Sequence, residues 1–150
     1  MSNVNEQLSM TGHLQIRLND ELVRDIPNLV VTAGKGFVAS RMIGTSAGVM
    51  SHMGVGSGST AAAGTQSALV TELGRSALDS TTRVTTTVSN DAIQYVATFG
   101  AGVGTGSLQE AGILNAASAG TMLSRVIFGV ITKGAADTLT ITWKVTIAAS

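Results

Sequence analysis

The chain has no cysteine, few aromatic residues and little charge, and each shortage counts against a class of protein. Without cysteine it forms no disulfide, thiolate metal site or catalytic thiol. Aromatic residues make up 3% of the sequence, whereas sugar-binding platforms need exposed aromatic rings. Lysine plus arginine number 9, as do aspartate plus glutamate, so no positive surplus exists to neutralise nucleic-acid phosphates. A nucleic-acid partner is therefore not expected.

The low charge content also bears on self-association. Charged residues are 12% of the 150-residue chain and the formal net charge is zero, which gives a monomer little electrostatic protection against association. This composition favours a surface largely covered by other subunits, and an ordinary charge-poor domain is the alternative. The length indicates a single domain that can bury a substantial core.

Neither a leader nor a membrane span is indicated. The first ten residues, MSNVNEQLSM, lack the basic and apolar regions of a signal peptide. Residues 44–71 carry no charge, but Gly, Ser, Thr and Ala make this stretch too polar for a membrane helix. We therefore expect no membrane partner.

The last part of the chain, TLTITWKVTI, has the clearest pattern. Ile141, Trp143 and Val145 share one face with their apolar neighbours, and threonine and lysine occupy the other face. Alternation with a period of two and many β-branched residues is typical of a half-buried antiparallel strand. The pattern predicts that Trp143, Ile141 and Val145 belong to the core.

Short strands separated by turns extend over most of the chain. Leu14, Ile16 and Leu18 alternate with polar residues, and Asn19-Asp20 predicts a hairpin turn after them. One helix is expected over 35–43, closed by Gly44, and a second short one over 67–73. Further strands are expected over 22–26, 29–32, 49–55, 78–88, 92–99, 108–115 and 121–131.

These elements predict an all-β fold. We expect an antiparallel β-sandwich or jelly-roll-like domain over residues 11–150, with one or two short helices. Residues 1–10 are predicted to form a flexible N-terminal arm, because Val4, Leu8 and Met10 offer too little apolar surface to fold alone. These three residues are candidate contacts with a neighbouring chain.

The stretch GVGSGSTAAAG raises the possibility of a phosphate-binding loop. Gly56, Gly58 and Ala61 fit a GxGxxA pattern, and Asp79 lies at a suitable distance downstream. A dinucleotide site needs a long helix after the glycines, yet Gly64 interrupts that segment and no second strand–helix unit follows. The stretch is interpreted as a loop, and no cofactor is expected.

Residues that could carry chemistry are scattered. His13 is expected to be solvated, and His52 to be packed or in an interface. The arginines at 75, 83 and 125 are expected to be exposed or in interface salt bridges. The carboxylates occur singly, as Glu72, Asp79, Asp91, Glu110 and Asp137. No catalytic, cofactor-binding or metal-ligating residue is predicted, so the chain is not expected to be an enzyme.

Several segments carry a resemblance. The order of NLVVTAGKGFVASRM, SHMGVGSGST, ALVTELGR, EAGILNAASAGTMLSRVIF and DTLTITWKVTI resembles that of small structural proteins of tailed-bacteriophage virions. The resemblance covers roughly residues 28–147. It implies a place in the virion and brings no catalytic residue.

The resemblance implies a structural role. A capsid decoration (cement) protein is favoured, because the chain is short and has one domain, and a tail, collar, baseplate or fibre-attachment protein is the alternative. A nucleotide- or sugar-binding module is a more distant alternative. The expected partners are the major capsid protein or tail proteins and further copies of the chain, as a dimer or trimer, in a virion assembled from protein made in the host cytoplasm.

Overall fold

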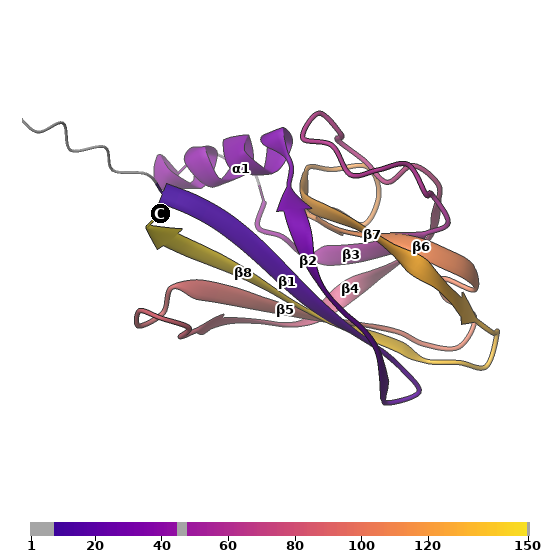
Figure 1. The fold of residues 1–150 in the computed structure, drawn as a ribbon. Coiled ribbons are helices and arrows are strands. Elements are labelled where there is room, and N and C mark those ends of the chain that lie inside the picture. The colour runs from indigo at the N-terminus through magenta and orange to yellow at the C-terminus, as the bar shows by residue number, and fades with distance from the viewer. Residues whose placement is uncertain (1–7, 45–47, 150) are drawn as a thin grey trace, which may run out of the picture.

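The computed structural model describes residues 8–44 and 48–149, which form eight strands and one helix (Figure 1). The elements are β1 (Leu8–Leu18), β2 (Glu21–Val30), α1 (Thr32–Met42), β3 (His52–Gly56), β4 (Glu72–Val84), β5 (Ala92–Phe99), β6 (Gly106–Leu114), β7 (Met122–Lys133) and β8 (Leu139–Ala149). The strand order is β1-β2-β7-β6-β3-β4-β5-β8, and all neighbouring strands are antiparallel.

The sheet closes into a barrel, so the all-β prediction is confirmed and the sandwich is wrong. Closure depends on β8, which pairs with β1 from Leu8↔Ala149 to Leu18↔Leu139 and with β5 along the other edge. Alternation shows which side of a strand is buried, and the inner faces of a sandwich and of a barrel have the same alternation. The sequence pattern therefore did not distinguish the two.

The barrel interior is filled by inward-facing residues. Trp143, Ile141 and Val145 on β8 are buried, as the alternation predicts, and Trp143 lies opposite Leu14 on β1 and Tyr95 on β5. The Asn19-Asp20 turn joins β1 to β2 with positive φ at both residues, the conformation of a two-residue hairpin turn.

The seam between β2 and β7 has the shortest ladder. These strands pair only at Leu29↔Arg125 and Val30↔Ser124. Farther along, Nη2 of Arg24 bridges the gap by donating to the carbonyl oxygens of Gly129 (3.0 Å) and Val130 (3.1 Å). Pro27, where the sequence suggested a break between two strands, lies within β2 in the part that pairs with β1 alone. A strand with one free edge tolerates proline.

Helix α1 covers one end of the barrel. Its first turn lies so close to β7 that a Cβ on Gly34 would overlap the carbonyl oxygen of Leu123. The helix begins three residues earlier than expected, and Gly44, with φ of +68°, follows its end as predicted. The second helix, predicted over 67–73, is absent: this segment is a loop that runs into β4.

The N-terminal boundary also differs from the prediction. Leu8, Ser9 and Met10 belong to β1 and pair with Ala149, Ala148 and Ile147 of β8, so the arm does not extend to residue 10. Backbone hydrogen bonds to β8 order these residues even though they contribute little apolar surface. Val4 lies outside the described residues.

Truncation of Trp143 tests the core. Because this side chain is fully buried, Trp143→Ala should lower the free energy of unfolding by about 3–5 kcal/mol. The measurement is urea denaturation followed by circular dichroism, since the variant has no tryptophan fluorescence. A soluble variant as stable as the wild type would contradict the buried position.

A pH-dependent contribution to stability is expected from the β4–β5 turn. The Asp91 carboxylate accepts hydrogen bonds from Oγ1 and N of Thr86 (both 2.7 Å), N of Val88 (3.0 Å) and N of Thr87 (3.1 Å). These bonds, that of the Thr86 hydroxyl foremost, hold the pKa of Asp91 well below its usual value of 3.8.

Asp91→Asn should therefore be less stable than the wild type near neutral pH, and the difference should shrink as the pH falls below 3.8. A carboxylate whose pKa is lowered in the folded state stabilises that state at pH values above the pKa of the unfolded chain. The stabilisation is lost as the pH falls and the carboxylate is protonated. Asp20→Asn is the control, because no described residue donates a hydrogen bond to the Asp20 carboxylate. Equal pH dependence of wild type and Asp91→Asn would contradict this role.

Candidate functional site

A fully buried ion pair joins two neighbouring strands. Glu110 on β6 and Arg125 on β7 have no exposed side-chain surface, and Nη2 and Nε of Arg125 lie 2.8 Å and 3.0 Å from Oε2 of Glu110. Two buried charges cost desolvation energy, which good geometry and further hydrogen bonds offset. The remaining bonds of this pair all reach the long loop between β3 and β4.

The pair fixes both ends of the 57–71 loop. The Glu110 carboxylate accepts hydrogen bonds from the backbone N–H groups of Gly58 (3.1 Å), Val70 (3.0 Å) and Thr71 (2.7 Å). Nη1 of Arg125 donates to the carbonyl oxygen of Thr60 (2.9 Å) and to Oε1 of Gln66 (3.0 Å). The loop is thus attached to the barrel by charge-assisted hydrogen bonds, which are stronger than neutral ones.

This contact explains the alternating glycines. A Cβ on Gly58 would lie 2.6 Å from Oε1 of Glu110, and one on Gly56 would lie 2.6 Å from the same oxygen and would overlap the carbonyl oxygen of Thr71. Glycine is therefore needed for close approach, since neither residue has a positive φ. The loop surrounds a carboxylate of the protein itself, and no helix follows the glycines as a dinucleotide site requires.

Two of the three arginine predictions are wrong. Arg125 is buried, and Arg75 is mostly covered: it pairs with Glu72 (2.6 Å) and donates to the carbonyl oxygens of Ala116 and Ala119 (both 2.9 Å). Arg83 is exposed, as expected. One signal was available for the buried pair: Glu110 and Arg125 are single charges within otherwise apolar or uncharged strands, LQEAGIL and MLSRVIF.

The histidines lie apart in the fold as well. His13 pairs with the Asp25 carboxylate on the adjacent strand, an exposed contact that lowers the pKa of Asp25, chiefly through the hydrogen bond to His13. His52 Nδ1 lies 2.8 Å from Oγ of Ser51. In residues 8–44 and 48–149, no three His, Cys, Asp or Glu side chains are grouped to hold a metal ion. Within the same ranges, no helix has the length and apolar character to cross a membrane.

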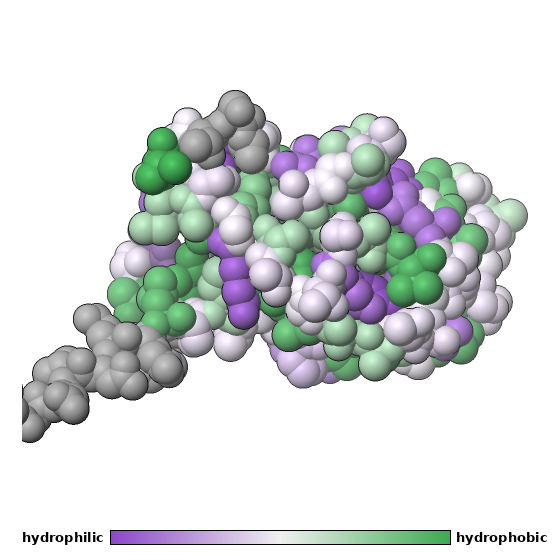
Figure 2. Space-filling model, turned by 90° about the horizontal axis from the view of Figure 1, so that it is seen from above, coloured by the Kyte–Doolittle hydropathy of each residue, from purple (hydrophilic) through white to green (hydrophobic). Residues whose placement is uncertain are grey.

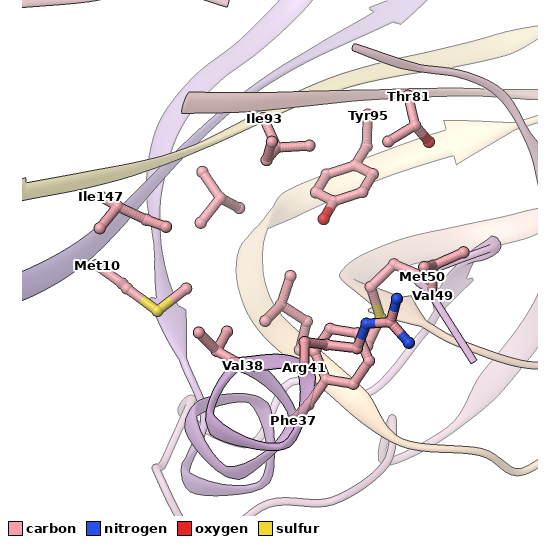
Figure 3. Close-up of a pocket in the computed structure, with 12 residues that line it drawn as sticks. Met10, Phe37, Val38, Arg41, Val49, Met50, Thr81, Ile93, Tyr95 and Ile147 are labelled. Atoms are coloured by element: carbon pink, nitrogen blue, oxygen red, sulfur yellow. The ribbon is translucent and has the colours of Figure 1, made fainter. Parts of the chain in front are cut away.

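A cavity of about 350 Å³ lies at the barrel end that α1 covers (Figure 3). Inward-facing residues of β1, β4, β5 and β8 form one side, and α1 with residues 49–50 and Leu123 forms the other. Its walls are almost entirely apolar. The lining residues are Met10, Phe37, Val38, Arg41, Val49, Met50, Thr81, Ile93, Tyr95, Leu123, Val145 and Ile147.

Large apolar side chains are exposed on the segments that line this cavity. They are Leu8, Met42, Ile43, Val49 and Ile147, which are between 38% and 83% exposed and which we call the apolar rim. Val49 and Ile147 line the cavity, Met42 and Ile43 follow the lining residue Arg41, and Leu8 lies two residues before Met10. In the view of Figure 2, hydrophobic residues are visible at the end of the molecule that bears α1 and also at the opposite end.

The rim and the cavity contain two of the three candidate interface residues. Leu8 belongs to the rim and Met10 to the cavity, whereas Val4 lies outside the described residues. Sequence reasoning did not find the other members, because they come from strands and a helix far apart in the chain. Searches found no matching protein-family model, curated protein or solved structure.

Removal of one partner of the buried pair should be costly. Arg125→Met leaves the Glu110 charge buried without its cation, and a loss of about 3–5 kcal/mol of unfolding free energy is expected. Arg125→Met combined with Glu110→Gln should be more stable than Arg125→Met alone, because glutamine is neutral and retains an acceptor for the loop N–H groups.

The measurements are urea denaturation and limited proteolysis within residues 57–71, where the single variant should be cut faster than the wild type. Arg83→Met, at an exposed arginine, is the control. A loss below about 1 kcal/mol, the range of exposed ion pairs, would contradict the role assigned to the pair.

Proposed function

We propose that this protein is a non-enzymatic structural subunit of a tailed-phage virion, a decoration protein that stabilises the capsid shell through subunit contacts. The apolar rim carries the proposal. Exposed apolar side chains are normal when scattered, but a cluster around a hollow is typical of a surface that another molecule covers.

Rim chemistry favours a protein partner. Aliphatic and thioether side chains dominate it, and such side chains form the centre of protein–protein interfaces, where charged residues are depleted. Burying one large apolar side chain contributes about 1.5–3 kcal/mol, so a few rim residues provide a substantial part of the affinity of a subunit contact. The low overall charge of the chain is consistent with a molecule that functions inside an assembly.

The resemblance described above supports a virion as the assembly. The order of segments over residues 28–147 resembles that of virion structural proteins, and a role as a tail, collar, baseplate or fibre-attachment protein is the second candidate. Both candidates use the rim as the contact surface and involve homo-oligomers of the chain. They differ only in the neighbour: the major capsid protein for decoration, or tail proteins for the alternative.

The test uses phage particles assembled without this chain, to which purified protein is added. Met42→Ser and Ile43→Ser, at the two most exposed positions of the rim, should each weaken binding about tenfold or more. Leu22→Ser is the matched control, since Leu22 is also exposed and lies near the β1–β2 turn at the opposite end of the barrel (Figure 1).

Binding is measured by co-sedimentation, and electron microscopy of labelled protein locates it on the shell or the tail. Binding of the wild type to the shell, together with weaker binding of the rim variants, supports decoration. Binding of the labelled protein to the tail supports the second candidate. Equal binding of rim and control variants would exclude the rim as the contact surface, and absence of wild-type binding would overturn the virion proposal.

A further inference from the structure

The cavity beneath the rim has the position of a ligand site. Met10, Ile93, Tyr95 and Val145 come from three neighbouring strands and face the barrel interior, while α1 closes the opposite side. Eight-stranded barrels are wide enough to hold one small ligand, and ligand pockets commonly occupy barrel mouths. Its volume of about 350 Å³ lies at the lower end of the range of such pockets.

One polar group of a mostly buried residue faces this apolar space. The Tyr95 hydroxyl is directed into the cavity (Figure 3), and no described residue lies within hydrogen-bonding distance of it. Tyr95 is only 8% exposed, and this burial raises the pKa of its hydroxyl, which therefore remains a neutral donor at physiological pH. The neighbouring Thr81, opposite Tyr95 in the β4–β5 ladder, adds a second hydroxyl to the lining.

We propose that the barrel-mouth cavity binds a small aliphatic molecule that carries one neutral hydrogen-bond acceptor, in the class of medium-chain alcohols and esters. The aliphatic part packs against the methionine, valine and isoleucine side chains, and the acceptor oxygen receives the Tyr95 hydroxyl proton in a hydrogen bond. A neutral head group fits the neutral donor, and among the described residues no carboxylate lines the cavity to bind a cationic one.

This site is independent of the proposed virion role. The rim and the cavity share Val49 and Ile147, but the other rim residues lie outside the cavity lining, and a bound molecule would fill the apolar hollow whether or not a neighbouring subunit covers the opening. The experiment uses the isolated full chain without particles, so its failure leaves the virion proposal intact, and failure of that proposal leaves the site intact.

The methionines allow a site-specific measurement. Decanol is titrated into protein labelled with ¹³C at the methionine methyl groups, and chemical shifts are followed. Met10 and Met50 line the cavity and should shift together in a saturable manner, whereas the buried Met122 outside it should not. Saturable shifts at the two lining methionines support the site. Their absence, or equal shifts at Met122, would overturn it.

Two α1 variants locate the ligand. Val38→Trp fills the cavity and should abolish decanol binding, while Ala39→Trp places the same ring at an exposed position of the same helix, outside the cavity lining and the rim, and should leave binding unchanged. If Val38→Trp does not fold, Ile93→Phe is used instead, because it reduces the cavity volume from the β5 side. If a variant with a filled cavity folds correctly and still binds decanol as the wild type does, decanol binds elsewhere.

The hydrogen bond is tested separately. Tyr95→Phe should weaken decanol binding about two- to tenfold, as expected for one neutral hydrogen bond, and leave the binding of xenon, which has no acceptor, unchanged. Equal decanol affinity of wild type and Tyr95→Phe would overturn the assigned acceptor contact. Because Arg41 also lines the cavity, decanoate is compared with decanol, and tighter, salt-sensitive decanoate binding would overturn the neutral head group.

Discussion

The pairing of the last strand with both the first and the fifth is the constraint on which the remainder of the structure depends. β8 lies between β1 and β5, so it satisfies the backbone groups of two strands that would otherwise be sheet edges, and it places Trp143 at the centre of the interior. This pairing joins residues at opposite ends of the chain. The barrel therefore closes only after the C-terminal strand is available, and such non-local pairing is typical of slow folding.

The same constraint creates the cavity. Because β1 and β8 continue past the core to Leu8 and Ala149, their inward-facing residues Met10 and Ile147 extend beyond the filled layers of the barrel. Helix α1 covers this extension from the side of β7, and the space between them is the cavity (Figure 3). The apolar rim surrounds the same opening, so the proposed contact surface and the proposed ligand site both result from the overhang of two paired strands.

Much of the secondary structure could be predicted from the sequence, because alternation and turn residues act locally. The final strand with its buried Trp143, the Asn19-Asp20 turn and one helix before Gly44 are examples. Closure could not be predicted, since a strand pattern does not specify its partner. The loop over 57–71 could not be predicted either, because its conformation depends on Glu110 in β6 and on Arg125 in β7. Local reasoning had assigned Arg125 to the surface.

Of the candidate site, Leu8 and Met10 could be named from the sequence as contact residues, expected in an arm, and Val145 only as a core residue. The cavity brings together residues separated by more than a hundred positions, for which a periodic pattern carries no information. Met10 and Ile147 meet because their strands pair in register, which becomes visible only in the folded chain.

The short β2–β7 ladder has a mechanical consequence. Two backbone pairs and one guanidinium hold this seam, whereas β8 is hydrogen-bonded along both edges. Local opening of a protein follows its least-supported contacts. The barrel should therefore open locally along this seam, with rapid hydrogen exchange of those β2 amides that point toward β7 rather than β1, and slow exchange in β8. A pulling force should separate β2 from β7 before it disturbs the strands around Trp143, so the barrel opens at a seam that only β1 and β2 separate from its best-protected strand.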